Sequence, residues 1–295
     1  MRNKFTGVGV ALITPFNEDL SVDYKGLQAV LQQAIDGGVD YIVVNGTTSE
    51  ASTLKKEEKS EILNFVATFL DNRLPIMYGI GANDTNHVLD LIKETDFSHV
   101  DAILTVSPYY NKPSQYGIES HYIDVANASP VPVLLYNVPG RTGSNVDAST
   151  TLRLAQHPNI FGIKEASGDL SQCLDIMKGK PDDFMLISGD DILTIPMISI
   201  GAEGVISVLA NAFPDSFSEC IHKALNGDFT GGTAGLHRFL GINKLLYLES
   251  NPVGIKEALT NIGICDRYVR KPLLPASLEL RNQIAQELSQ IKAIQ

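Results

Sequence analysis

A lysine lies inside an otherwise apolar run at residues 161–167, whose sequence is FGIKEAS. Successive side chains of a strand alternate between its two faces, so Lys164 should share a face with Gly162 and Ala166, while Phe161 and Ile163 point the other way. A salt bridge, or a stem that reaches the rim, would explain such a lysine structurally. A nucleophilic amine would explain it chemically, because an apolar environment disfavours the charged form of lysine.

Further polar side chains follow other apolar runs of the sequence. The paired hydroxyls of Thr47 and Thr48, with backbone N–H groups at a strand end, suit a small carboxylate. A tyrosine can pass protons during imine formation, and Arg141 offers a two-pronged contact for a second carboxylate. These features predict a Schiff-base lysine between two carboxylate-binding points. The segments concerned are GTTSEAS (46–52), SPYYNKPSQ (107–115), YNVPGRTG (136–143), GIKEAS (162–167) and SGDD (188–191).

Each of these segments also has a structural interpretation. Residues 47–50 could form a helix-capping box, the tyrosines at 109–110 could be surface aromatics, and Arg141 could pair with an acid. Asp190 and Asp191 could bind a cation or act as an acid and base, but as a strand-end turn they are expected to hold loop backbone. Five such segments, each at the end of an apolar run, favour a common site.

The elements that must position these residues are eight apolar, β-branched runs separated by amphipathic stretches. The runs are continuous and not alternating, as in strands covered on both faces. Eight such units in about 225 residues predict an α/β fold of the (β/α)8 TIM-barrel type, with its active site at the carboxyl ends of the strands. A doubly wound open sheet is the alternative, since periodicity does not show closure. The runs are 7–14, 41–46, 75–81, 101–108, 132–139, 160–167, 183–191 and 203–211.

The strand pattern stops after Asn226, and helical patterns follow at 228–248, 251–263 and 275–292. Two of these three segments carry a proline near the start, and the second ends in glycine, as helices often do. The sequence therefore predicts two parts. Residues 1–227 form a catalytic (β/α)8 barrel and residues 228–295 form a C-terminal helical subdomain.

Composition argues against several classes of function. The 295 residues include 34 acidic and 23 basic ones, a formal charge of −11, which disfavours nucleic acid or an anionic membrane as partner. No apolar run approaches the roughly 18–20 residues of a membrane helix, and the first residues lack a signal-peptide cleavage site. Three dispersed cysteines argue against a disulfide framework and for a reducing cytoplasm.

No motif for a nucleotide cofactor or a metal is present. The sequence has no GxxxxGK, no GxGxxG after a strand and no HExxH. Its six histidines have no ligand-like spacing, which makes a metal-dependent aldolase an unfavoured interpretation. We therefore expect neither cofactor nor metal.

The strand-end segments, together with GVISV at 204–208, resemble the motifs of the 4-hydroxy-tetrahydrodipicolinate synthase family, within the pyruvate-dependent class I aldolases. Six motifs in the same order extend this resemblance over the whole chain. It implies a (β/α)8 barrel with a C-terminal helical subdomain, assembled as a homotetramer that is a dimer of dimers.

The resemblance also implies roles for individual residues. Lys164 matches the lysine that forms an imine with pyruvate, and Thr47 and Thr48 match the pair beside the pyruvate carboxylate. Thr47 and Tyr136 match a proton relay that is completed by Tyr110 of the neighbouring subunit. Three further matches complete the implied site: Arg141 for the carboxylate of aspartate semialdehyde, and Gly189 and Ile206 as lining of the pyruvate pocket.

Ser49 departs from the family pattern, which reads GTTGE where this chain has GTTSE. If the glycine of that pattern has a positive φ, a serine would cost about 1 kcal/mol and shift the loop slightly. A second departure concerns feedback inhibition by lysine. Family members that bind lysine carry an acceptor where this chain has His87, and His or Glu where it has Lys59, so we expect free lysine to inhibit weakly.

These observations favour condensation of pyruvate with L-aspartate-4-semialdehyde, giving 4-hydroxy-tetrahydrodipicolinate for diaminopimelate and lysine biosynthesis. One alternative is another pyruvate aldolase, such as N-acetylneuraminate lyase or a keto-deoxy sugar acid aldolase, which would need a hydroxyl-binding cleft and not an arginine at position 141. A second alternative is a regulatory barrel that binds a small acid without catalysis. Intact Lys164, Tyr136 and Thr47 weigh against it, because a binding protein has no use for a nucleophile.

Overall fold

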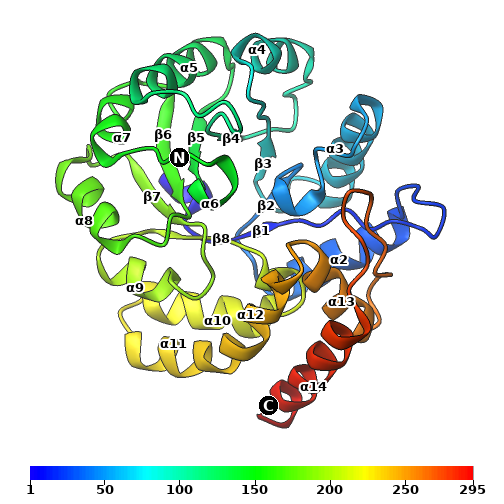
Figure 1. Cartoon of the computed structure of the whole chain (residues 1–295). Coiled ribbons are helices and arrows are strands. Elements are labelled where there is room, and N and C mark those ends of the chain that lie inside the picture. The colour runs from blue at the N-terminus through cyan, green and yellow to red at the C-terminus, as the bar shows by residue number, and fades with distance from the viewer. Residues whose placement is uncertain (295) are drawn as a thin grey trace.

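The eight apolar runs form one closed barrel of parallel strands, in the order β1-β2-β3-β4-β5-β6-β7-β8, with β8 pairing back to β1 (Figure 1). The computed structural model describes the backbone of residues 1–294, and the side chains of all of these except 2, 3 and 292–294. Closure confirms the predicted TIM barrel over an open doubly wound sheet. The strands are Gly7–Ala11 (β1), Tyr41–Val44 (β2), Ile76–Gly79 (β3), Ala102–Val106 (β4), Val133–Asn137 (β5), Ile160–Glu165 (β6), Met185–Ser188 (β7) and Gly204–Ser207 (β8).

Helices surround the barrel because the strands must be covered on their outer face (Figure 1). Side-chain caps fix several helix starts: Asp23, Asp84 and Asp169 each accept hydrogen bonds from backbone N–H groups of the first turn. The helices over residues 1–225 are Arg2–Phe5 (α1), Tyr24–Asp36 (α2), Thr47–Ser49 (η1), Lys56–Leu70 (α3), Thr85–Glu94 (α4), Gln115–Ala128 (α5), Pro139–Thr142 (α6), Ala148–Leu154 (α7), Leu170–Gly179 (α8), Thr194–Ser199 (α9), Leu209–Asn211 (η2) and Pro214–Leu225 (α10).

The predicted helices after residue 226 are present. We propose that the subdomain boundary lies at residues 227 and 228, where Gly227 has a φ of 89° between α10 and the next helix. Two of the later helices, α12 and α13, pack on each other and on the last helix. The helix α13 packs on η2, which follows β8, and its Lys256 pairs with Glu50, which follows β2. These helices are Phe229–Leu236 (α11), His237–Phe239 (η3), Leu240–Leu248 (α12), Val253–Asn261 (α13) and Leu278–Ile294 (α14).

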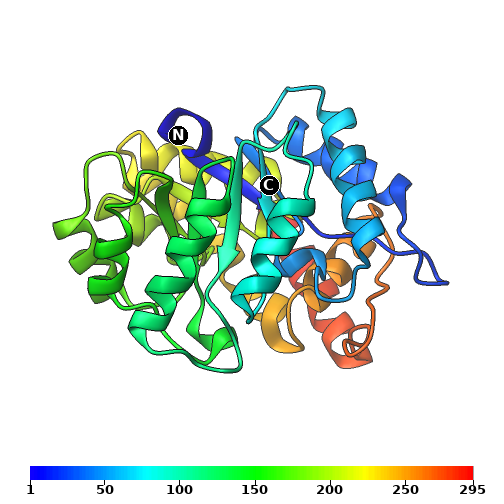
Figure 2. The same cartoon turned by 90° about the horizontal axis from the view of Figure 1, so that it is seen from above.

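Two apolar cores result. The larger one fills the layer between the strands and the helices, and a smaller one fills the barrel interior, with Met77, Leu104, Leu134 and Ile187 among its members. Phe5 of α1 belongs to this interior core: its ring is fully buried, stacks on Phe161 and meets the edge of Tyr41. The N-terminal turn therefore closes the end of the barrel opposite the C-terminal helices (Figure 2).

The position of Phe161 corrects the sequence prediction that it points away from the face of Lys164. The pairing of β5 with β6 shifts between Val133 and Leu134, where an extra residue of β6 is accommodated. Phe161 therefore joins the interior core although Ile163, two residues later, lies in the outer core. A β-bulge of this kind changes the parity of a strand, which alternation in the sequence cannot reveal.

No helix among residues 1–294 is both long enough and apolar enough to cross a membrane.

Candidate active site

Lys164 and Tyr136 are paired positions on the neighbouring strands β6 and β5, near their carboxyl ends. The Lys164 Nζ lies 4.3 Å from the centre of the Tyr136 ring, and the two residues are 6% and 7% exposed. Within the part of the chain that the structure describes, no carboxylate forms an ion pair with Lys164. A salt bridge therefore does not explain this buried lysine.

Gly189 lies against the stem of Lys164, and Ile206 belongs to the same interior core as Tyr136; their role as lining of the pyruvate pocket stays a prediction. A Cβ on Gly189 would lie 2.9 Å from Cε of Lys164 and 2.7 Å from Cβ of Ala166, so a glycine is needed where β7 passes the lysine stem. Ile206 of β8 is 1% exposed and belongs to the interior core together with Tyr136. The wall around the lysine is thus apolar and tightly packed.

The threonine segment forms the short helix η1 at the end of β2. The residues with a left-handed backbone are those that flank η1, and Ser49 is not one of them. Positive φ values occur at Asn45 and Glu50, at 57° and 56°. Ser49 has no such φ, so the cost expected for a serine at that position does not arise. It is 2% exposed, and its hydroxyl donates to the Leu12 carbonyl oxygen at 2.6 Å, which ties η1 to the chain that follows β1.

The two threonines of this segment differ in environment. Thr48 is 3% exposed, and its Oγ1 accepts a hydrogen bond from Nδ2 of Asn251 at 2.9 Å, whereas Thr47 is exposed. Asn251 also connects to Arg141 of α6, because its main-chain oxygen accepts from Nη2 of that arginine at 3.5 Å. The two predicted carboxylate-binding points are therefore linked through a residue that the sequence interpretation missed.

The Glu50 carboxylate does not take part in a helix-capping box; Glu50 is the C-cap residue of η1 through its backbone N–H, which donates to the Thr47 carbonyl oxygen. Glu50 is 3% exposed, and one carboxylate oxygen lies 2.6 Å from Nζ of Lys256 in α13. The other oxygen accepts the backbone N–H of Arg270 at 2.8 Å. Burial lowers the pKa of Lys256, and the charge of Glu50 opposes that shift. The C-terminal helices thereby fix the segment that carries Thr47 and Thr48.

Asp190 and Asp191 hold backbone, as the structural interpretation predicted. Asp190 accepts from the N–H groups of Ile192 and Leu193, and Asp191 accepts from those of Val208 and Leu209. Burial raises the pKa of Asp191 to about 6. These carboxylates therefore shape the loops that follow β7 and β8.

Tyr110, like Thr47, is a predicted catalytic residue that is exposed in the single chain. Its side chain is 86% exposed, and its φ of 74° is uncommon for a residue with a Cβ. The backbone N–H of Tyr110 donates to the Thr142 carbonyl oxygen at 3.2 Å, which fixes the loop beside α6. The sequence prediction that it serves a neighbouring subunit stays a prediction.

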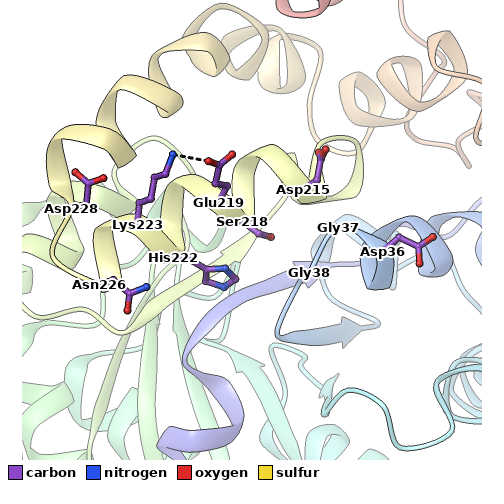
Figure 3. A pocket seen from close by; sticks show the side chains of 10 residues that line it. All are labelled: Asp36, Gly37, Gly38, Asp215, Ser218, Glu219, His222, Lys223, Asn226 and Asp228. Carbon is purple, nitrogen blue, oxygen red and sulfur yellow. Dashed lines mark hydrogen bonds and ion pairs between the residues drawn. The ribbon is translucent and has the colours of Figure 1, made fainter. Parts of the chain in front are cut away.

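A hollow of about 510 Å³ lies at the opposite end of the barrel, between the end of α2 and helix α10 (Figure 3). Among the residues that line it, His222 is bonded to Asp40, and Lys223 pairs with Glu219. None of the predicted site residues lines it. The predicted site residues lie instead around Lys164, near the carboxyl ends of β5 and β6.

A closed parallel barrel with an unpaired lysine beside a tyrosine at the carboxyl ends of its strands is the arrangement of a class I, Schiff-base aldolase. The sequence profile of the dihydrodipicolinate synthetase family matches residues 4–291. The chain belongs to this family, as its motifs predicted.

Individual relatives agree with this membership. A protein of Cytophaga hutchinsonii named 4-hydroxy-tetrahydrodipicolinate synthase is 54% identical over 282 residues, covering 96% of this chain and 95% of the relative. One of Parabacteroides distasonis with the same name is 47% identical, covering 97% and 96%.

Solved structures also match over nearly the full length. The chloride-inhibited dihydrodipicolinate synthase of Acinetobacter baumannii in complex with pyruvate has a TM-score of 0.95 and 37% identity, covering 98% of this chain and 99% of that one. A monomeric variant of dihydrodipicolinate synthase also has a TM-score of 0.95, at 32% identity, covering 98% and 97%.

Proposed function

We propose that this chain condenses pyruvate with L-aspartate-4-semialdehyde to 4-hydroxy-tetrahydrodipicolinate, with Lys164 as the nucleophile. The observation that carries the proposal is the buried Lys164 amine, which faces the Tyr136 ring and has no carboxylate partner among the described residues. The names of the relatives and the pyruvate complex of the Acinetobacter protein support the same reaction.

The reaction begins when the Lys164 amine adds to the ketone carbon of pyruvate. Tyr136 passes a proton to the resulting carbinolamine oxygen, which leaves as water and gives a protonated imine. Loss of a methyl proton turns the imine into an enamine, for which the iminium nitrogen is the electron sink. Thr47 and Tyr110 of a neighbouring subunit complete the proton path to solvent.

The enamine carbon then attacks the aldehyde carbon of the second substrate. Thr48 holds the pyruvate carboxylate, and Arg141 holds the carboxylate of the semialdehyde. The amine of the semialdehyde attacks the imine carbon, closes the ring and expels Lys164 as a free amine. The balance is one pyruvate and one semialdehyde converted to one product and one water, and Gly189 and Ile206 shape the pocket in which this occurs.

The oligomeric state and the cellular compartment are part of the same proposal. We propose a homotetramer made as a dimer of dimers; the exposed side chain of Tyr110 supports a contact in which this tyrosine reaches the site of a neighbouring subunit. The three cysteines are unpaired in the structure, which supports residence in a reducing cytoplasm.

Borohydride reduction in the presence of pyruvate tests the mechanism. Reduction should fix the imine as a carboxyethyl group on the peptide that contains Lys164, as read by mass spectrometry. Lys256 is the matched internal control, because it is equally buried but paired with Glu50. Modification of Lys256 or of no lysine would overturn the proposal. Faster cleavage of a sugar acid than condensation of the semialdehyde would favour the related aldolases.

A further inference from the structure

Asn251 joins the two carboxylate-binding points of the proposed site. It lies in the connection between α12 and α13 and is 5% exposed. Its Nδ2 donates to Oγ1 of Thr48 at 2.9 Å, and its main-chain oxygen accepts from Nη2 of Arg141 at 3.5 Å. Asn251 thus contacts two residues that lie 203 and 110 positions away from it in the sequence.

The direction of the bond to Thr48 decides what that threonine can do. A hydroxyl has one proton to donate and two lone pairs, whereas an amide nitrogen can only donate. Because Thr48 accepts from Asn251, its own proton is left for another acceptor. Among the described residues no acceptor takes that proton, although Thr48 is 3% exposed.

The neighbouring Ser49 shows the opposite arrangement. Its hydroxyl donates to the Leu12 carbonyl oxygen, so its proton is used within the protein. The other side-chain atom of the Asn251 amide makes no competing contact. Its Oδ1 is buried and accepts no hydrogen bond from the described residues. The bond to Thr48 is therefore the contact that this amide makes through its side chain.

We infer that Asn251 is a positioning residue that orients the Thr48 hydroxyl so that its proton points to the carboxylate of the keto acid bound at Lys164. The inference rests on the proposed function. Asn251 acts by occupying one lone pair of Thr48, and the freed proton then forms a charge-assisted hydrogen bond with the substrate.

Asn251→Asp tests the direction of this bond. A carboxylate can only accept, so Thr48 would have to donate to it and would lose the proton meant for the substrate. Loss of a hydrogen bond to a charged group should raise KM for pyruvate about 10- to 100-fold. KM for the semialdehyde should change less than about 3-fold, because the Arg141 contact uses the main-chain oxygen of residue 251. An unchanged KM for pyruvate would overturn the inference.

The same substitution in a Thr48→Val background separates orientation from direct charge repulsion. If Asn251 acts through Thr48, Asn251→Asp should add little once the hydroxyl is absent, whereas repulsion of the substrate would add its full effect and contradict the inference. Asn226→Asp, at the opposite end of the barrel, is the matched control and should leave both KM values unchanged.

Two further measurements complete the test. If Asn251→Asp does not fold, Asn251→Ala should still raise KM for pyruvate about 3-fold, only when Thr48 is present, and an unchanged KM would contradict the inference. Borohydride trapping of the wild-type protein distinguishes failure of the proposed function from failure of the role inferred for Asn251. No adduct on Lys164 overturns the proposed function and the inference together, while an adduct with no effect of Asn251→Asp overturns the inference alone.

Discussion

The ammonium group of Lys256 lies 2.6 Å from a carboxylate oxygen of Glu50, although the two residues are 206 positions apart and their side chains are 0% and 1% exposed. Lys256 also donates to the Tyr268 carbonyl oxygen at 2.8 Å and faces the Phe16 ring at 4.1 Å. An ion pair at this depth holds only when both charges remain paired. The threonine segment therefore depends on the last quarter of the chain.

Lys256→Met should destabilise the protein by about 3–5 kcal/mol, because it leaves the Glu50 carboxylate buried without its cation. The urea midpoint of unfolding measures this loss. Adding Glu50→Gln should recover much of the stability, since the amide is neutral and can still accept the Arg270 N–H. A double variant as unstable as the single one would show that packing of the lysine stem, and not charge, matters.

Arg141→Ala should reduce kcat/KM for aspartate semialdehyde about 30- to 1000-fold, the effect of losing about 2–4 kcal/mol of a bidentate carboxylate contact. Imine formation with pyruvate should be unaffected, because Arg141 is exposed at the rim. Steady-state kinetics and borohydride trapping measure the two effects separately. An equal loss of semialdehyde turnover and of imine formation would indicate that Arg141 maintains the structure of the site and does not bind the semialdehyde.

Tyr110→Phe should lower kcat while leaving the fold intact, since the side chain is 86% exposed in the single chain. Tyr116→Phe, whose side chain is 80% exposed, is the matched control and should be active. Co-expression of Tyr110→Phe with Lys164→Ala subunits should restore activity, because a mixed pair contains one complete site. No restoration in verified mixed assemblies would argue against a shared site.

His222 should make stability depend on pH. Its Nε2 lies 2.7 Å from Oδ2 of Asp40, which also accepts the Val8 N–H, and this bond raises the pKa of His222 above its usual 6.5. Because the folded-state pKa is the higher one, the stabilisation is complete below about pH 6.5 and is lost as pH rises through the folded value. The loss should be below about 1 kcal/mol, as His222 is half-exposed.

Urea unfolding between pH 5.5 and about 8.5 measures this dependence in the wild type and in His222→Gln. The variant should lose the decline in stability over that range, while His99→Gln, an exposed control, should retain it. A decline of equal size in His222→Gln would assign the pH dependence to other groups.

Free lysine should inhibit weakly. By the family resemblance, Lys59 and His87 replace acceptors of the effector's ammonium groups, and an added positive charge about 4 Å away is unfavourable by roughly 4 kcal/mol. Initial rates at saturating pyruvate should stay above half of their uninhibited value up to about 1 mM lysine. Lys59→Glu combined with His87→Glu should increase sensitivity, and strong inhibition of the wild type would contradict the charge argument.

The barrel and the place of Lys164 could be predicted from the sequence because both depend on local patterns. Continuous apolar runs mark buried parallel strands, and a lysine between small residues marks an inner face. The contacts of Asn251 and Lys256 could not be predicted, because they join segments more than 200 residues apart and depend on how the C-terminal helices pack. The β-bulge that turns Phe161 inward could not be predicted from the sequence either, because the register of β6 is set by its pairing with β5.

The buried Phe5 at the N-terminal end of the barrel also bears on the order in which the two substrates bind. In the proposed reaction both substrates should therefore reach Lys164 from the carboxyl ends of the strands, and the second substrate should bind near Arg141, which is exposed. We expect the keto acid to bind first, because the semialdehyde reacts only with the enamine that pyruvate forms on Lys164. Substrate binding should therefore be ordered, and excess semialdehyde should inhibit competitively with respect to pyruvate.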